Sequence, residues 1–219
     1  MSRNVIMFGT GASSYKEYDE LSKIVEMCLY NEVYCFDTAP SYKTELPLAK
    51  TLNLCMKNRK LSREQLYIQT KIDPDQMQDN DGRVLETINR TLDKMNISYI
   101  DSLLVHWPLP EYFLRTWEDL QALKAEGLVR KIGICNVRIW NLQQYLEIGI
   151  IPDIIQIERN PLRTCYDEIA FCKEHNVQVQ AYSPLCKMDA RLRDNDILNK
   201  IAKTHEKDVG QIILRWHID

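Results

Sequence analysis

The sequence predicts an α/β fold, a (β/α)8 TIM-type barrel, and two observations support it. Short apolar runs alternate with amphipathic helical segments, and strict βα alternation indicates a parallel sheet with helices outside. Three consecutive predicted strands also end in different ionisable residues, Asp37, Lys71 and His106. In a barrel, the chemistry lies where the strands end and the βα loops begin, so this placement favours the barrel.

A doubly wound sheet is the alternative fold. Gly9 and Gly11 follow the first predicted strand, and a helix then leads to a second strand that ends in Asp37. This order imitates a dinucleotide-binding fingerprint, but Ser14 stands where the third glycine belongs. Two glycines alone are weak evidence, so the doubly wound sheet is the minority interpretation.

Seven segments are predicted to be strands because each is a short run of β-branched, aromatic or other apolar residues. They are 5–8, 33–36, 66–70, 103–105, 130–135, 154–158 and 178–182. The second is the most informative, because its β-formers end abruptly on Asp37. A turn follows, and Tyr42 comes five residues after the acid.

Each predicted strand is followed by a helix, in which apolar residues recur with the spacing of one helical face. The predicted helical segments are 21–29, 46–56, 84–95, 117–123, 141–148, 166–175, 195–205 and 209–217. Gly127 is typical of a helix stop. Asp208, followed three residues later by Gln211, predicts a capping box at the last helix.

Length and composition indicate one domain, 1–219, with no linker-like stretch inside it. Hydrophobic residues make up 45% of the chain, and a chain of this length buries roughly 70% of its unfolded surface. The fold therefore needs no disulfides or structural metals for stability. There are 28 Lys and Arg against 31 Asp and Glu, a net charge of −3 with no block of one sign. This balance argues against nucleic acid or an anionic membrane as a general partner.

The seven cysteines are scattered, odd in number and without a CxxC pair, which predicts free thiols in a reducing compartment. The first residues show no signal-peptide character, and no stretch approaches the length of a membrane span. We therefore expect a cytoplasmic protein. We expect no metal site.

Six motifs, in this order and spacing, resemble the landmarks of the aldo-keto reductase superfamily: FDTAPSY, QTK, LLVHWP, GICN, QIERNP and AYSPL. They run from the second predicted strand to the seventh. The resemblance implies a (β/α)8 barrel that binds NADPH without a Rossmann fold. It also implies a catalytic set of Asp37, Tyr42, Lys71 and His106.

The chemistry of carbonyl reduction asks for these residue types, because the carbon receives a hydride and the oxygen receives a proton. Tyr42 can be the acid, and a nearby Lys71 ammonium stabilises its phenolate and lowers a pKa that is ordinarily about 10. Asp37 keeps Lys71 charged against the effect of burial. His106 can donate to the carbonyl oxygen, although the sequence does not fix its tautomer.

Each of the four residues also has a plainer interpretation. Asp37 alone is typical of a cap, and Tyr42 alone of a loop aromatic packed on the rim. Lys71 alone is typical of a solvated lysine, and His106 alone of a structural histidine. The four together, with the motif pattern, favour the catalytic interpretation.

The resemblance assigns cofactor contacts to six residues: Asp37, Asn136, Gln156, Tyr182, Ser183 and Leu185. In the family, residues matching Asn136 and Gln156 hold the nicotinamide carboxamide, and the one matching Tyr182 stacks on the nicotinamide ring. Those matching Ser183 and Leu185 contact the pyrophosphate side. Plainer alternatives are a hydrogen bond inside the barrel for Gln156 and rim packing for Tyr182.

The sequence departs from the family pattern in three places. Cys135 stands where the family commonly has serine, and Arg159-Asn160 replaces the more usual Tyr-His. The chain stops at Asp219, where the family continues into an eighth strand and the loop that holds the adenosine 2′-phosphate. We therefore expect seven βα units with the eighth strand missing, an open edge that favours self-association, and weakened NADPH binding.

The function expected from these features is NADPH-dependent reduction of an aldehyde or ketone to an alcohol, with Tyr42 as general acid and NADPH rather than NADH as cofactor. The alternative is a weak or inactive barrel relative that senses a nucleotide or binds a partner protein. The intact catalytic set favours the enzyme, and the missing C-terminal segments favour the alternative. The physiological substrate, the cofactor preference and the oligomeric state do not follow from the sequence.

Overall fold

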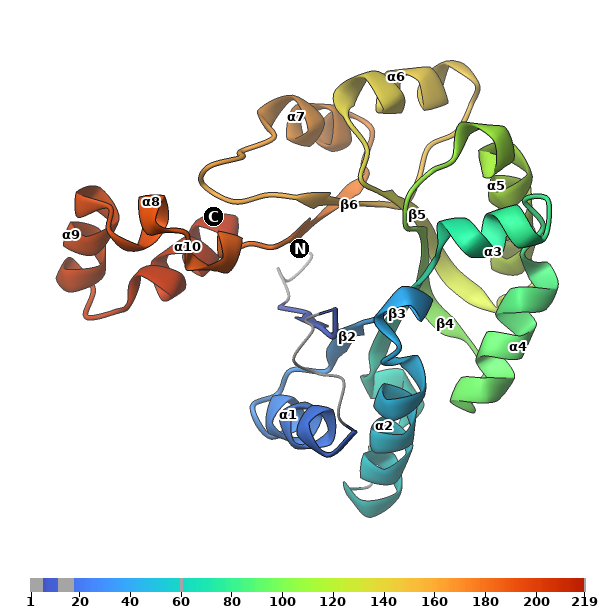
Figure 1. The fold of residues 1–219 in the computed structure, drawn as a ribbon, viewed down its shortest axis with the longest axis horizontal. Coiled ribbons are helices and arrows are strands. Elements are labelled where there is room, and N and C mark those ends of the chain that lie inside the picture. Colours follow the sequence, from blue (N-terminus) through green and yellow to red (C-terminus); the bar gives the residue numbers. More distant parts are fainter. Residues whose placement is uncertain (1–5, 12–17, 60, 219) are drawn as a thin grey trace. The chain divides into compact units, whose positions relative to one another are not determined.

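The computed structural model describes residues 6–11, 18–59 and 61–218. The chain divides into two compact units, Met1–Cys135 and Asn136–Asp219. In the described residues there are seven strands, and along the chain they alternate with helices as the sequence predicts (Figure 1). Val5 and Ser14, named in the strand and fingerprint predictions, lie outside the described residues.

The first unit contains five parallel strands: β1 (Phe8–Gly9), β2 (Cys35–Asp37), β3 (Tyr67–Ile72), β4 (Ile100–Val105) and β5 (Val129–Cys135). Each pairs with the next one in sequence order, without the reversal of order that defines a doubly wound sheet. This order confirms the barrel-type interpretation and removes the minority one.

The helices of the first unit are α1 (Tyr18–Tyr30), α2 (Glu45–Arg59), α3 (Pro74–Asp79), α4 (Leu85–Met95) and α5 (Pro110–Ala125). Figure 1 shows them on the outer side of the strands. Alternate strand residues such as Phe36 and Ile68 point outward into this layer. There they join a core cluster with Leu21, Val25 and Leu48 from α1 and α2.

Polar contacts around Asp101 and Tyr99 join the N-terminal ends of β3, β4 and β5. Asp101 of β4 accepts hydrogen bonds from the Ile68 backbone at 2.9 Å and from the Arg63 guanidinium at 2.7 Å. The Tyr99 ring lies between two guanidinium groups, that of Arg63 at 4.0 Å and that of Arg130 at 3.8 Å from its centroid. Arg130 also bonds to Asp101 at 3.2 Å, so one carboxylate links three chain segments.

The second unit contains two parallel strands, β6 (Ile154–Glu158) and β7 (Gln178–Tyr182). Its helices are α6 (Ile139–Glu147), α7 (Tyr166–Glu174), α8 (Ala190–Arg193), α9 (Asp196–Thr204) and α10 (Val209–Ile218). The predicted capping box before α10 is confirmed. The Gln211 backbone N–H donates to Asp208 at 2.7 Å, and the Asp208 backbone N–H donates to the Gln211 side chain at 3.1 Å.

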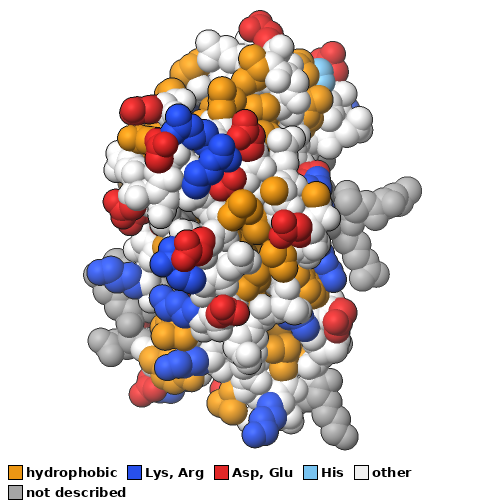
Figure 2. All heavy atoms as spheres, turned by 90° about the vertical axis from the view of Figure 1, so that its right-hand side faces the viewer, with side chains coloured by type: hydrophobic (Ala, Val, Ile, Leu, Met, Phe, Trp, Pro, Cys, Tyr) orange, Lys and Arg blue, Asp and Glu red, His pale blue; other side chains and the backbone are white. Residues whose placement is uncertain are grey.

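The surface agrees with the balanced composition. On the face drawn in Figure 2, acidic and basic side chains are interspersed with apolar ones. Among the described residues, no helix is long and apolar enough to cross a membrane. The seven cysteines are all free thiols in this structure.

Candidate active site

A row of polar side chains crosses the interior face of three neighbouring strands. The strand register places Asp37, the last residue of β2, beside Gln69 of β3, and Gln69 beside Ser102 of β4. Ser102 donates to Gln69 Oε1 at 2.5 Å, and Gln69 Nε2 donates to Asp37 Oδ1 at 2.7 Å. All three residues are buried. Asp37 is therefore held in place from β3 and β4 as well as by its own strand.

Lys71 completes this row, because it lies two residues after Gln69 and shares its face of β3. Its ammonium donates to both Asp37 oxygens at 2.7 Å and to the Thr38 carbonyl at 3.0 Å. Only 1% of Lys71 is exposed. Burial acts to lower the pKa of Lys71, but the Asp37 carboxylate and further neighbours outweigh it and the net direction is upward. The expected Asp37–Lys71 ion pair is present, and it keeps Lys71 charged.

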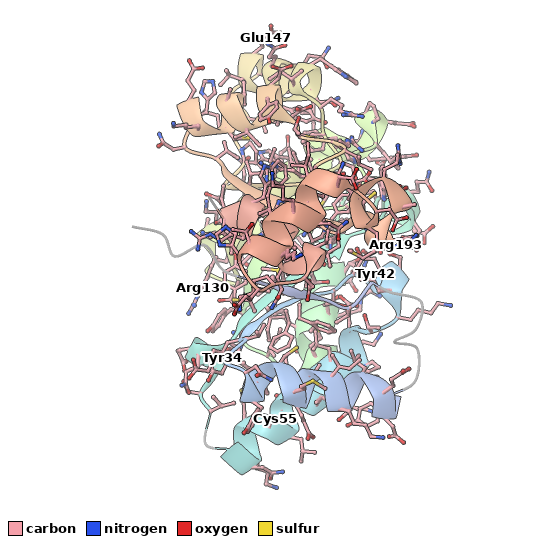
Figure 3. The ribbon with its side chains drawn as sticks, turned by 90° about the vertical axis from the view of Figure 1, so that its left-hand side faces the viewer. Tyr34, Tyr42, Cys55, Arg130, Glu147 and Arg193 are labelled. Atoms are coloured by element: carbon pink, nitrogen blue, oxygen red, sulfur yellow. The ribbon has the colours of Figure 1, made fainter. Side chains whose placement is uncertain are left out.

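Tyr42 lies beside this ion pair, in the short 3₁₀ turn Pro40–Tyr42 that follows β2. In Figure 3 it lies at the opposite end of the strands from Tyr34 and Arg130. The Lys71 nitrogen is 4.8 Å from the centroid of its ring. Burial raises the pKa of Tyr42, and the Lys71 charge lowers it as expected but does not cancel the effect of burial, so the net direction is upward.

The backbone at Gly11 packs directly against the Tyr42 ring. A Cβ atom at this position would lie 3.0 Å from two ring carbons of Tyr42, closer than ordinary van der Waals contact. Any larger residue would force the Tyr42 ring or the backbone to shift by a few tenths of an ångström, so glycine suits this close approach independently of any dinucleotide fingerprint. The sequence shows the glycine but not the ring that it contacts.

His106 follows β4 and faces Tyr42. Its backbone N–H donates to the Ile72 carbonyl at 2.9 Å, and its Nε2 lies 3.4 Å from the Tyr42 hydroxyl. The two rings meet edge to face, with their planes at 86°. On its other side, Nδ1 pairs with the carboxylate of Asp73. The structure thus brings Asp37, Tyr42, Lys71 and His106 together in the first unit.

Sequence reasoning missed Asp73. This residue follows β3 and precedes Pro74 and α3, and an Asp-Pro pair before a helix is typical of a cap. Nothing in the local sequence indicates that its carboxylate points to a histidine 33 positions later. Gln69 and Ser102 were missed for the same reason, because their partners lie on other strands.

In the second unit, three of the predicted cofactor residues meet. The Tyr182 hydroxyl donates to Asn136 Oδ1 at 2.7 Å, and the Asn136 backbone N–H donates to the Gln156 carbonyl at 3.0 Å. The Gln156 side chain donates to Gln180 on the neighbouring strand at 3.2 Å. Asn136 has a left-handed backbone with φ of 58°, a conformation in which asparagine is enriched among non-glycine residues.

Two further predicted cofactor residues of the second unit follow β7. Ser183 is exposed and has a left-handed backbone with φ of 47°. Leu185 is half-buried and packs against the apolar cluster formed by α8, α9 and α10, which includes Leu192 and Ile213. Leu185 thus has a structural role in packing against this cluster, whatever its contact with a cofactor.

Arg159, one of the departures from the family pattern, is not a freely solvated charge. Its guanidinium lies 4.0 Å from the centroid of the Trp216 ring and 2.8 Å from His217 Nδ1. Burial lowers the pKa of Arg159. The residue therefore ties the end of β6 to α10 within the second unit.

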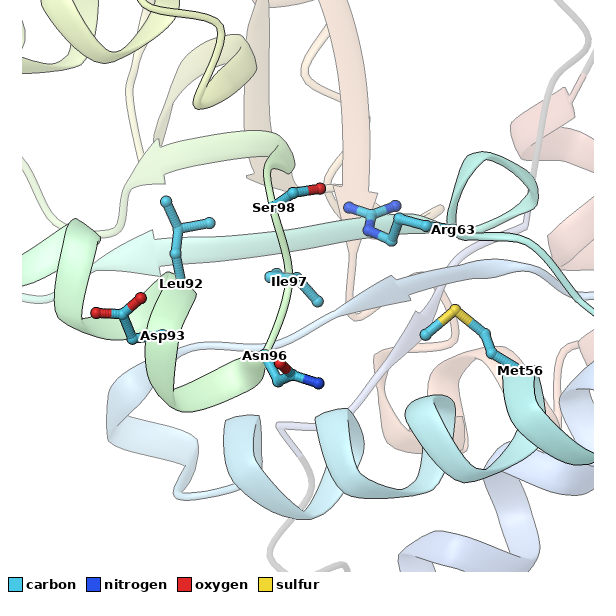
Figure 4. Close-up of a pocket in the computed structure, with 7 residues that line it drawn as sticks. All are labelled: Met56, Arg63, Leu92, Asp93, Asn96, Ile97 and Ser98. Atoms are coloured by element: carbon cyan, nitrogen blue, oxygen red, sulfur yellow. The ribbon is translucent and has the colours of Figure 1, made fainter.

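A hollow of about 510 Å³ lies elsewhere in the first unit and contains none of the predicted catalytic residues (Figure 4). Its lining comes from α2, from α4 and the loop after it, and from the segment before β3: Met56, Arg63, Leu92, Asp93, Asn96, Ile97 and Ser98. The Arg63 guanidinium in this lining is already bonded to Asp101. Within residues 6–11, 18–59 and 61–218, no cluster of three or more His, Cys, Asp or Glu side chains is arranged to hold a metal ion.

Comparison with known proteins identifies a family for almost the entire chain. The model of the Aldo/keto reductase family matches residues 5–219. The chain is 33% identical to the methylglyoxal reductase DkgA of Escherichia coli K12 over 204 residues, which cover 92% of this chain and 71% of that protein. It is 32% identical to the glyoxal reductase of Bacillus subtilis over 213 residues, 96% of this chain and 74% of the relative.

Solved structures agree with the sequence comparison. An aldo/keto reductase from Brucella melitensis superimposes with a TM-score of 0.84 at 31% identity, covering 97% of this chain and 79% of that one. The Bombyx mori aldo-keto reductase, solved in complex with NADP, superimposes with a TM-score of 0.83 at 29% identity, covering 97% and 75%.

Proposed function

This chain belongs to the aldo/keto reductase family, and on that premise we propose that it reduces a small aldehyde or ketone to an alcohol with NADPH, using Tyr42 as the general acid. The observation that carries the proposal is the contact of Tyr42 with both Lys71 and His106, beside the Asp37–Lys71 ion pair. No plainer interpretation of the four residues requires them to meet.

The geometry suits proton donation at a carbonyl oxygen. The Tyr42 phenol, whose pKa is ordinarily about 10, is protonated near neutral pH, so a proton is available for transfer. When the phenol gives up that proton, the Lys71 ammonium beside the ring stabilises the phenolate that remains. Asp37 holds the ammonium in place, and His106 orients the carbonyl oxygen toward the Tyr42 hydroxyl.

The residues of the second unit fit a nicotinamide by the chemistry of their side chains. A nicotinamide carboxamide has one donor group and one acceptor, and Asn136 and Gln156 are amides with the same pair of functions. Tyr182 supplies a half-buried aromatic ring for stacking, and Ser183 and Leu185 are the proposed contacts toward the pyrophosphate. Bound NADPH supplies the hydride to the carbonyl carbon. We propose NADPH as the cofactor because the Bombyx mori relative was solved in complex with NADP.

The proposed substrate class is a small reactive carbonyl, with methylglyoxal and glyoxal as the first compounds to test. The relatives named for reduction of these two compounds are 33% and 32% identical to this chain. The seven free cysteines favour a reducing, cytoplasmic location. Self-association through an open strand edge stays a prediction, which light scattering tests.

Tyr42→Phe is the decisive variant, because it removes the transferable proton and keeps the ring. Methylglyoxal reduction, followed as oxidation of NADPH, should fall by about 100-fold or more, with NADPH binding unchanged in a fluorescence titration. Tyr34→Phe is the matched control at the opposite end of the strands and should keep the parent rate. Parent-like turnover in Tyr42→Phe would reject the assignment. A parent chain that binds NADPH without reducing any carbonyl would support the inactive relative instead.

A further inference from the structure

Asp73 contacts two parts of the candidate active site with one carboxylate. One oxygen pairs with Nδ1 of His106, and the other accepts a hydrogen bond from the Ser41 backbone N–H at 2.7 Å. The side chain is 5% exposed. Ser41 immediately precedes Tyr42, so the same carboxylate binds the histidine and the turn that carries the tyrosine.

Asp73 is the N-cap residue of α3 and forms a capping box with Gln76, but capping alone does not account for its contacts with His106 and Ser41. The Asp73 backbone N–H donates to the Gln76 side chain at 2.9 Å, and the Gln76 backbone N–H donates to Asp75 at 3.0 Å. These bonds, with Pro74 in the first turn, begin the helix. Beyond this capping role, one carboxylate oxygen of Asp73 contacts His106 and the other contacts Ser41.

The contact with Asp73 determines which ring nitrogen of His106 carries a proton. Burial acts to raise the pKa of Asp73, but the bonds from His106 and Ser41 outweigh it and the net direction is downward. The group is therefore a carboxylate near neutral pH, and a carboxylate only accepts hydrogen bonds. Nδ1 of His106 must be the donor, which leaves Nε2 facing the Tyr42 hydroxyl.

Other neighbours limit the ring to this orientation. The His106 backbone N–H is bonded to the Ile72 carbonyl, and its ring stacks with Trp107 at a centroid distance of 6.2 Å. Tyr42 packs against the ring edge to face. The ring is thus fixed by packing, and Asp73 selects its tautomer.

We propose that Asp73 is a positioning residue, which holds His106 in the Nδ1–H tautomer with Nε2 toward Tyr42 and the substrate oxygen, and which fixes the Tyr42 turn through Ser41. The catalytic part of this inference rests on the proposed carbonyl reduction, whereas the tautomer does not. In the neutral ring, Nε2 accepts the Tyr42 O–H bond. Donation from Nε2 to a carbonyl oxygen requires the doubly protonated ring, whose charge is balanced by the Asp73 carboxylate and would not be balanced by an amide.

The first test measures the tautomer without catalysis. Multiple-bond ¹H–¹⁵N spectra of the ¹⁵N-labelled chain distinguish Nδ1–H from Nε2–H for each histidine, and His106→Gln identifies the signals of His106. The parent should show the Nδ1–H form at neutral pH. Asp73→Asn places an amide where the carboxylate was, and its NH₂ group can donate to Nδ1, so the Nε2–H form should increase. A parent ring in the Nε2–H form, or a tautomer unchanged by Asp73→Asn, would overturn the proposal.

The second test measures the consequence for catalysis. Asp73→Asn should lower kcat for methylglyoxal by at least about tenfold and change the pH profile of kcat, with a smaller effect on KM. Asp75→Asn, which removes the neighbouring exposed acid on the same helix, is the matched control and should leave both parameters unchanged. An Asp73→Asn enzyme with the parent kcat and pH profile would refute the positioning role. If the parent reduces no carbonyl, the spectra still decide the tautomer, so this failure is distinct from failure of the proposed function.

Discussion

Replacing Lys71 by methionine tests the ion pair at the centre of the site, because methionine keeps most of the apolar stem and removes the charge. The variant removes both hydrogen bonds that the Lys71 ammonium donates to the Asp37 carboxylate, which belongs to a residue only 8% exposed, and it keeps the bond from Gln69. Breaking a buried ion pair from one side costs about 3–5 kcal/mol. Because the Gln69 bond remains, we expect Lys71→Met to lose unfolding free energy at the lower end of this range, about 3 kcal/mol.

A loss of this size is readily measured. For a chain of 150–250 residues, 1 kcal/mol shifts Tm by roughly 2–4 °C, so Lys71→Met should lower Tm by roughly 6–12 °C. Urea unfolding should give the matching loss of free energy. The double variant Lys71→Met/Asp37→Asn, which removes the stranded charge, should recover about 1–3 kcal/mol while remaining inactive. A Lys71→Met chain within about 0.5 kcal/mol of the parent would refute the argument that the pair is buried and coupled.

Three further predictions follow from the same geometry. Gly11→Ala should lower kcat, because the added Cβ lies 3.0 Å from the Tyr42 ring and displaces it. Steady-state kinetics should show this loss of kcat, while an unfolding curve should show little change in the free energy of unfolding. Asp101→Ala should cost about 3 kcal/mol of unfolding free energy in urea, since it removes the carboxylate that pairs with Arg63 and that accepts the Ile68 N–H, yet turnover per folded molecule should equal that of the parent. The raised pKa of Lys71 stabilises the fold fully below about pH 10.4, the value of the unfolded side chain. That stability is lost as pH rises through the higher pKa of the folded state. The free energy of unfolding should therefore fall more steeply with rising alkaline pH in the parent than in Lys71→Met. Equal slopes would contradict this.

The alternation of strands and helices was predictable from the sequence because its signals are local. Periodicity located the seven strands to within a few residues. The first was predicted at 5–8 and is Phe8–Gly9, and β4 begins at Ile100 rather than at residue 103. Two short helices, α3 and α8, were missed, because four to six residues are too few for a 3.6-residue period to become visible. Asp208 and Gln211 were correctly predicted as a capping box, since both partners lie within one helical turn.

The candidate site was predictable only in part. Asp37, Lys71 and His106 stand out because each follows or ends a strand, where a sequence pattern can be recognised. Gln69 and Asp73 do not, because their roles depend on partners 32 or 33 positions away. The sequence also shows that Lys71 lowers the pKa of Tyr42, but not that burial outweighs this effect, because burial depends on the packing of distant segments.

The stack of Tyr99 between Arg63 and Arg130 affects how this fold can diversify. Arg130, one member of the stack, lies at the end of the strands opposite Tyr42 in Figure 3, so these contacts stabilise the fold at a place separate from the groups proposed to perform the chemistry. Effects at separated sites with no shared partners usually add, so a stabilising change near the stack can offset a destabilising one near Tyr42. A lineage carrying this stack could therefore accumulate substitutions in the loops beside Tyr42, and explore new substrates, without losing the folded state.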